Sequence, residues 1–415
     1  MNDDSKIKPR RALGFANIGH FLNHVIMLIY PTIALTLADI WKISYGELFK
    51  LFFIGSLLYG VAALPAGWLG DKWSSWWMLA IYLIGTGVAT FLTGFANSPL
   101  EISFGLGTIG LFAAIYHPVG TNFVVQHSEN RAKALGFNGA FGTFGLAAAA
   151  LISAGLCQLW GWRAAFFIPG AICLLVGFCF VMFTERNLEI VEKQKNSPGI
   201  IPVKLDKSRL ALSLVAITAL SVGLIAQAYT TGLPKIFDDS LKNLISFFSM
   251  NRKSGLTLSS SLVTVVLLAG VIGQLLGGYL ASRYSPKAVY IGMFSAVIPL
   301  MFVAAHLKGV PLVVVAALMM VMFTGCLPAE NCIIVRFCPE HWRARAFSAK
   351  FVIALGGGSF AILAVGEIFD RVAGEFWFFA FLLILAVAVI AFGSFIPSMK
   401  DSPKKHSTPI IEPAE

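Results

Sequence analysis

The sequence predicts an all-α polytopic membrane protein with twelve transmembrane helices in two six-helix lobes. Three observations lead to this fold class. The 415 residues are 57% hydrophobic and only 13% charged, with a mean hydropathy of +0.78. Apolar runs long enough to cross a bilayer, which takes about 20 residues, follow one another along the chain. Short motifs of the first half return in the second half at a nearly constant distance.

The composition excludes several classes of protein. A soluble domain has about 25% charged residues, so a chain with 13% lacks the polar surface that water requires. We therefore exclude an ordinary soluble enzyme, a disordered protein and a nucleic-acid-binding domain. The expected surroundings are the lipid bilayer, with no nucleic acid as a partner.

Twelve apolar runs stand in order along the chain, six on each side of a polar stretch. They are continuous, which favours helices over barrel strands, whose residues alternate between apolar and polar. The first eleven residues are polar and basic, but the run after them is too long for a signal peptide, so we expect it to remain as the first span. The runs cover residues 12–40, 46–70, 76–96, 100–127, 134–159, 164–184, 209–236, 257–282, 287–307, 310–335, 346–370 and 376–397.

The widest internal polar gap divides the chain into two halves. It is rich in Lys and Glu and contains Pro198 and Pro202, a composition typical of a linker. The apolar residues of the loop 237–256 predict a short interfacial helix. The predicted division is an N-terminal tail (1–11), a first lobe (12–185), a linker (186–208), a second lobe (209–397) and a C-terminal tail (398–415).

Basic residues predict the orientation in the membrane. If both termini are cytoplasmic, 22 of the 31 Lys and Arg residues fall on the cytoplasmic side. The positive-inside rule therefore predicts a multi-pass protein of the cell (inner) membrane with both termini in the cytoplasm. An even number of spans requires the termini to share a side.

An internal repeat relates the two halves. The segment Gly67–Trp76 follows the second span, and Gly278–Lys287 follows the eighth at an offset of 211 residues. Pro118 in the fourth span and Pro328 in the tenth differ by 210 residues. Because each half holds six spans, equal offsets give both halves the same orientation. This is the parallel repeat of a two-lobed transporter.

The first copy of the repeat resembles the loop 2–3 motif of the major facilitator superfamily, Gly-x-x-x-Asp-Arg/Lys-x-Gly/Ser-Arg/Lys-Arg/Lys. The second copy departs from the motif at Ser282, where Asp is usual. The resemblance implies that these residues stabilise a closed conformation at the cytoplasmic side. The gate residues that it implies are Gly67, Asp71, Lys72, Gly278 and Arg283.

A narrower resemblance lies in spans 1 and 4. The strings Gly19–His24 and Ile115–Pro118 are similar to the fosmidomycin-resistance-type transporters. That similarity implies proton-coupled efflux of a small polar or anionic compound. Two departures from proton antiporters leave an alternative open: Leu106 stands where they have a basic residue, and Leu146 replaces the Pro of their Gly-Pro pair. The alternative is a proton-coupled importer of a metabolite or siderophore-like compound.

Candidate site residues in the first half lie near the middle of the membrane. At 1.5 Å per residue, His24 and His117 both fall close to mid-depth. The superfamily resemblance implies that their spans line a central cavity, where imidazoles can bind an anion when protonated or relay protons. Simple packing is the other reading, and metal binding is a weak third option because no carboxylate or thiolate accompanies the rings. We therefore predict no metal. Further candidates are His20, Asn23 and Asn122.

The second half offers Glu330, two residues after Pro328, and Asn331 beside it. Lys350 lies at a similar depth in span 11, which predicts an ion pair between neighbouring helices. The pair either only locks the helices together or, if Pro328 breaks its helix, faces the cavity. Gln227 and Tyr229 in span 7 are additional candidates.

No motif of an enzyme accompanies these residues. The sequence contains no P-loop, GxSxG or HExxH motif. We therefore predict a secondary transporter without a cofactor, acting as a monomer on a small-molecule substrate and protons by alternating access.

Reporter fusions test the predicted topology. A reporter inserted at Ser197 should give the cytoplasmic signal and one inserted at Asn251 the opposite signal, because one polar segment separates spans 6 and 7 and the other separates spans 7 and 8. Alkaline phosphatase and fluorescent-protein fusions measure the two signals. Equal signals at both positions would contradict the twelve-span topology.

Overall fold

The computed structural model describes residues 4–128, 131–184, 205–248, 250–338, 343–372 and 375–397. About 90% of the described residues are helical, and none of them forms a strand. Twelve helical segments of this part are long and apolar enough to cross a membrane, so the predicted twelve spans are confirmed.

The first half contains six spans built from eleven helical elements. They are α1 (Asp4–Met27), α2 (Ile29–Trp41), α3 (Tyr45–Lys50), α4 (Phe52–Val61), α5 (Ala63–Lys72), α6 (Ser75–Thr93), α7 (Pro99–Ala113), η1 (Tyr116–Gly120), α8 (Thr121–Gln126), α9 (Arg131–Trp160) and α10 (Ala164–Phe183).

The second half contains the other six spans. Its elements are α11 (Leu205–Ser240), α12 (Lys242–Phe247), α13 (Arg252–Arg283), α14 (Pro286–Ala304), α15 (Gly309–Phe337), α16 (Arg343–Phe351), η3 (Val352–Gly356), η4 (Gly357–Ser359), α17 (Phe360–Arg371) and α18 (Glu375–Ser394). The short helix expected between spans 7 and 8 is α12.

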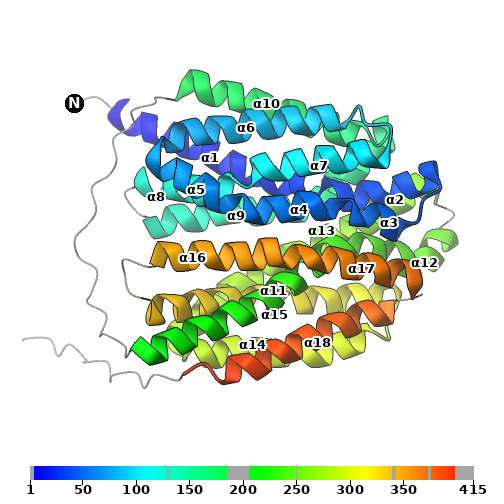
Figure 1. Ribbon diagram of the computed structural model, residues 1–415. Helices are drawn as coiled ribbons and strands as arrows, with labels where there is room; N and C mark the ends of the chain where they lie inside the picture. Colours follow the sequence, from blue (N-terminus) through cyan, green and yellow to red (C-terminus); the bar gives the residue numbers. More distant parts are fainter. Residues whose placement is uncertain are drawn as a thin grey trace, which may run out of the picture.

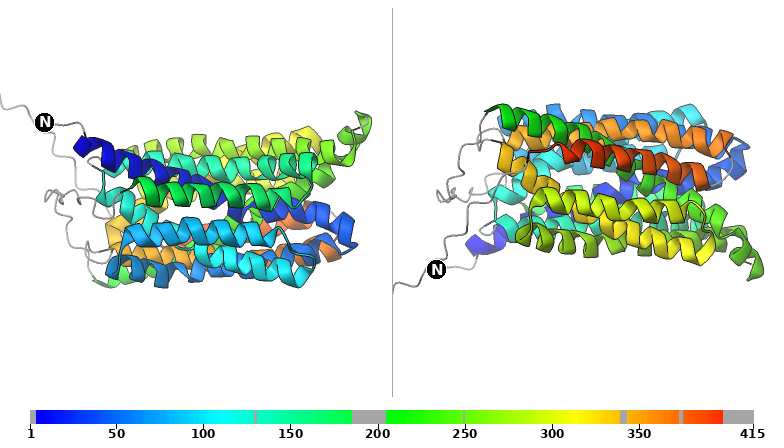
Figure 2. Two further views of the ribbon diagram at one scale, coloured as in Figure 1. Left: turned by 90° about the horizontal axis from the view of Figure 1, so that it is seen from above. Right: turned by 90° about the horizontal axis from the view of Figure 1, so that it is seen from below.

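The two halves form two lobes that lie side by side, the first above the second in Figure 1. Two further views, from above and below, show the helices running roughly along one direction (Figure 2). We call the end where α1 begins and α18 ends the tail end, and the opposite end the far end. Between the lobes, α9 packs against α13, α3 against α17, and α4 against η3 and η4.

Several helix boundaries differ from the sequence predictions. Helix α1 begins at Asp4, inside the predicted tail, and α11 begins at Leu205, inside the predicted linker. Hydropathy reports only the apolar part of a helix, so polar turns that extend beyond the bilayer are missed. For the same reason the motif residues Gly67–Lys72 are not in a loop but form the last turns of α5.

Three spans change their winding in mid-membrane. Span 1 breaks at Leu28, before Pro31, and span 4 is under-wound into a π-helix across Pro118. Span 11 passes through a π-helical turn and then a 3₁₀ turn at Gly357–Ser359. Proline cannot donate the helical hydrogen bond, which accounts for the first two irregularities. Short π segments of this kind often occur at functional sites.

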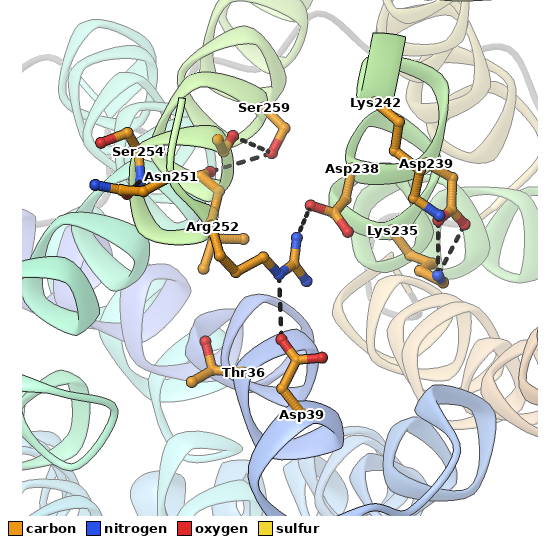
Figure 3. Close-up of polar contacts among 12 residues, drawn as sticks. Thr36, Asp39, Lys235, Asp238, Asp239, Lys242, Asn251, Arg252, Ser254 and Ser259 are labelled. Atoms are coloured by element: carbon orange, nitrogen blue, oxygen red, sulfur yellow. Dashed lines mark hydrogen bonds and ion pairs between the residues drawn. The ribbon is translucent and has the colours of Figure 1, made fainter. Parts of the chain in front are cut away.

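Charged side chains join the lobes at the far end. Arg252 of α13 donates from Nε to Asp39 Oδ2 of α2, 3.1 Å away, and pairs through Nη1 with Asp238 of α11 (Figure 3). Asp39 belongs to the first lobe and Asp238 to the second, so Arg252 bridges the two. Beside it, Asp370 of α17 accepts a hydrogen bond of 2.9 Å from the Ser44 hydroxyl. These contacts hold the far end closed.

Deeper in the membrane the lobes touch through backbone. A Cβ added to Gly60 of α4 would lie 2.1 Å from the backbone nitrogen of Gly356 in η3, far inside contact distance. Next to this contact, Ser359 donates from its hydroxyl to Ser56 Oγ at 3.0 Å. The absence of a side chain at position 60 is therefore what permits this approach.

A single methyl group tests the contact between α4 and η3. Gly60→Ala should lower the melting temperature of the detergent-purified protein, because backbone cannot move aside and overpacking costs about 1–3 kcal/mol. The matched control is Gly136→Ala in α9, where a Cβ meets no atom within 4 Å. There the higher helix propensity of Ala should leave the melting temperature unchanged or raise it. Equal melting temperatures for the two variants would contradict the close approach.

Candidate functional site

Three histidines gather in the first lobe. His20 and His24 stand one turn apart on α1, and His117 lies in the π segment η1. One ring nitrogen of each lies within 4.8 Å of those of the other two. His20 is buried, and the other two rings are half-buried. The structure therefore brings together three residues that the sequence singled out on two separate spans.

A hydrogen-bonded frame holds His20. Its Nδ1 is 2.8 Å from the backbone oxygen of Asn138 on α9, and its ring stacks on Tyr116 with centroids 4.8 Å apart. The Asn138 side chain donates to Asn17 Oδ1 and to the Tyr116 hydroxyl. Facing the other way, His20 Nε2 lies 3.2 Å from His24 Nε2. The frame thus directs one nitrogen of His20 toward the cluster.

A second frame holds His117. The Tyr59 hydroxyl of α4 is 2.6 Å from His117 Nε2 and accepts a hydrogen bond of 2.8 Å from the Asn23 amide. Asn23 is fully buried, and within the described residues its Oδ1 has no hydrogen-bond partner. Asn122, also predicted for this site, lies half-buried on α8 and is not among the residues that form either frame.

The sequence reasoning missed Tyr59, Tyr116 and Asn138. Each is a polar side chain in an apolar run, and each is buried. A buried polar side chain in a membrane span must bond to a partner, so the position of Asn138 within an apolar run could have identified it as a candidate site residue. The two tyrosines were harder to identify from the sequence, because a tyrosine in an apolar run can serve for packing as readily as for hydrogen bonding.

The second lobe contains an ion pair. Glu330 on α15 is fully buried and pairs with Lys350 on α16, as the sequence predicts. Lys350 Nζ also donates to Asn331 Oδ1 at 2.8 Å. One buried acid is therefore balanced by one lysine.

The break considered at Pro328 is absent. Helix α15 runs without interruption from Gly309 to Phe337. Transmembrane helices tolerate proline when neighbouring groups satisfy the freed backbone. Glu330 of the ion pair therefore lies on a continuous helix.

The remaining candidates lie apart from these two groups. Tyr229 of α11 donates to the Ala316 carbonyl of α15 at 2.6 Å and so joins two helices of its own lobe. Gln227 is half-buried two residues earlier on the same helix.

The gate residues meet neighbours within their own lobes. Lys72 lies over the Trp68 ring at 4.8 Å, and Arg283 over the Tyr279 ring at 4.6 Å. A Cβ on Gly67 would lie 3.1 Å from the Pro118 ring, whereas one on Gly278 would meet nothing within 4 Å. The Asp71 side chain lies outside what the structure describes.

One aromatic contact connects the two polar groups across the lobe boundary. The His117 ring stacks on Phe351 with centroids 5.8 Å apart and an interplanar angle of 8°. Phe351 directly follows Lys350 on α16. The histidines of the first lobe and the Glu330–Lys350 pair of the second therefore stand on opposite sides of the same interface.

Comparison with known proteins identifies the family of the chain. The family described as Major Facilitator Superfamily matches residues 16–251 and 240–414. An uncharacterised MFS-type transporter of Bacillus subtilis, YfnC, is 26% identical over 69% of each chain. A probable sulfoacetate transporter of Cupriavidus necator, SauU, is 24% identical over 67% of this chain and 66% of its own.

The fold has counterparts among solved structures. A bacterial homologue of the human lysosomal transporter Spinster, in an inward-facing and occupied conformation, superposes with a TM-score of 0.69 at 15% identity. The alignment covers 94% of both chains. The narrower resemblance to fosmidomycin-resistance-type transporters is not tested by these comparisons and remains a prediction.

A double-mutant cycle tests the buried ion pair. Lys350→Met should sharply reduce the melting temperature, because leaving a buried carboxylate unpaired costs about 3–5 kcal/mol. The double variant Glu330→Gln/Lys350→Met should recover most of that loss, since no charge remains buried. Size-exclusion chromatography after heating measures the thermal unfolding of all four proteins of the cycle: wild type, Glu330→Gln, Lys350→Met and the double variant. Additive effects of the two substitutions would show that Glu330 and Lys350 do not interact.

Proposed function

The chain belongs to the major facilitator superfamily, and from this premise we propose that it transports a small organic anion together with a proton. The family and the relatives are transporters rather than enzymes. Alternating access of two lobes around a central site is the expected mechanism. The observation that supports the proposal is the contact across the lobe boundary between His117 and Phe351, the residue that follows Lys350 of the buried ion pair.

Lys350 is the proposed anion-binding residue. Its ammonium group already bonds two oxygens, one of Glu330 and one of Asn331, so a carboxylate or sulfonate can take the place of either. From the first lobe, the imidazoles of the histidine cluster can donate N–H groups to the same anion when they are protonated. One relative is described as a probable sulfoacetate transporter, which supports a small organic anion as the substrate class.

Glu330 is the proposed proton-binding residue. A proton that binds the Glu330 carboxylate removes its charge and so ends the ion pair with Lys350. The Lys350 ammonium group is then free to bind the anion. When the proton leaves, the carboxylate recaptures Lys350, and the anion is released. Proton and anion are thus bound together and released together.

This coupling favours uptake. An inward proton gradient drives two ligands that load together into the cell, whereas export would require them to compete. The importer that the sequence left as the alternative therefore becomes the main proposal. Export of a small polar compound is the second candidate, supported by the resemblance of Gly19–His24 and Ile115–Pro118 to efflux transporters.

The cellular setting belongs to the same proposal. We place the protein in the inner membrane, as a monomer, with the tail end facing the cytoplasm. The charge asymmetry of the sequence supports this orientation, because basic residues concentrate on the cytoplasmic side of membrane proteins.

Membrane vesicles test the function. Right-side-out vesicles with an acidic exterior should accumulate labelled sulfoacetate, or another labelled small organic anion, and collapse of the gradient should stop accumulation. Glu330→Gln should abolish gradient-driven accumulation while retaining exchange of labelled for unlabelled anion, since the variant stays in the proton-loaded form. His117→Ala should strongly reduce both activities.

Controls accompany the vesicle experiment. His306→Ala, an exposed residue near the far end of α14, should behave as wild type. Accumulation in everted vesicles with an acidic interior would establish export instead. Gradient-driven accumulation by Glu330→Gln at the wild-type rate would remove Glu330 from the coupling mechanism.

A further inference from the structure

We propose that His20, His24 and His117 form a binding site for one divalent transition-metal ion of the class that imidazole prefers, Zn²⁺, Co²⁺, Ni²⁺ or Cu²⁺. The inference rests on the geometry of the cluster and does not depend on the proposed transport function.

The nitrogen positions fit such an ion. In a tetrahedral zinc site with Zn–N bonds near 2.0–2.1 Å, ligand nitrogens lie roughly 3.4 Å from one another. His20 Nε2 and His24 Nε2 are 3.2 Å apart, which is already this spacing. The nitrogen of His117 lies within 4.8 Å of both, so its ring would have to move toward the pair to complete a three-coordinate face.

Residues around the cluster form hydrogen bonds to the histidine rings, as residues around a metal site usually do to the metal ligands. Metal-binding histidines usually donate their second N–H to a carbonyl or carboxylate, which fixes the tautomer. The Asn138 carbonyl, 2.8 Å from His20 Nδ1, accepts such a bond and leaves the lone pair of Nε2 facing His24. Tyr59, itself bonded by Asn23, orients the His117 ring in the same way.

The backbone makes room for the first ligand. A Cβ on Gly142 of α9 would lie 2.5 Å from His20 Nε2. The ring can occupy its position because residue 142 has no side chain. The fit depends on a residue that is not itself a ligand, which is a property of a built site rather than of a chance cluster.

The chemistry of the ligands selects the ion. Three neutral imidazoles suit borderline metals, whereas Ca²⁺ and Mg²⁺ require oxygen ligands. Three protein ligands leave a fourth position open. Without an ion, His24 Nε2–H can donate to the His20 Nε2 lone pair across the same 3.2 Å, so an ion would take the place of this hydrogen bond.

Cobalt binding to the purified protein tests the proposal. The protein is prepared in detergent without a histidine tag, stripped with chelator, and titrated with Co²⁺ at pH 8, where imidazole is deprotonated. A Cys332→Ser background removes an exposed thiol that can also bind metal. We expect one Co²⁺ per chain, with visible absorption typical of nitrogen ligands, and its displacement by Zn²⁺.

Variants separate the cluster from other sites. His24→Ala and His117→Ala should each weaken Co²⁺ binding at least tenfold, and His306→Ala should leave it unchanged. Gly142→Ala removes no ligand but displaces His20, and it should weaken binding to a similar degree. Melting temperatures identify any variant that fails to fold; His24→Gln replaces His24→Ala in that case.

Two results would overturn the site. One is a wild-type protein that binds less than half an equivalent of Co²⁺. The other is unchanged affinity in a folded His20→Ala/His24→Ala/His117→Ala protein. Because binding is measured without transport, a failure here leaves the transport proposal standing, and a failed transport experiment leaves this one.

Discussion

Every polar group within a bilayer must find its partner inside the protein, and this constraint organises the whole structure. The first lobe meets it with a network that connects α1, α4, η1 and α9 through Asn17, Tyr59, Tyr116 and Asn138. The second lobe meets it with Glu330 and Lys350. These bonds lie within single lobes, so a movement of one lobe against the other leaves them intact.

The irregular helical segments place these groups at the lobe boundary. His117 lies in a π turn, and Phe351 directly precedes another. A π turn holds one extra residue per turn, so it rotates the side chains that follow it relative to a regular helix. His117 therefore makes this contact from within a π turn, and Phe351 makes it from the end of α16, directly before the second π turn.

The sequence predicted the twelve spans, the repeat and the Glu330–Lys350 pair, because these depend on hydropathy and on depth along a helix. It could not predict Tyr59 or Asn138 as partners of the histidines, since that depends on how each helix is rotated about its axis. The prolines illustrate the same limit. Pro118 lies in an under-wound turn while α15 continues through Pro328, and only the surrounding helices decide between these outcomes.

The packing of α5 on η1 links the membrane surface to its centre. Gly67 sits against Pro118, and one turn further the Gly70 backbone faces Val119, so the tail end of α5 rests directly on the turn that holds His117. Helix α5 ends at the exposed Lys72. Because α5 and η1 are packed this closely, any tilt of α5 would have to change the shape of the turn that holds His117.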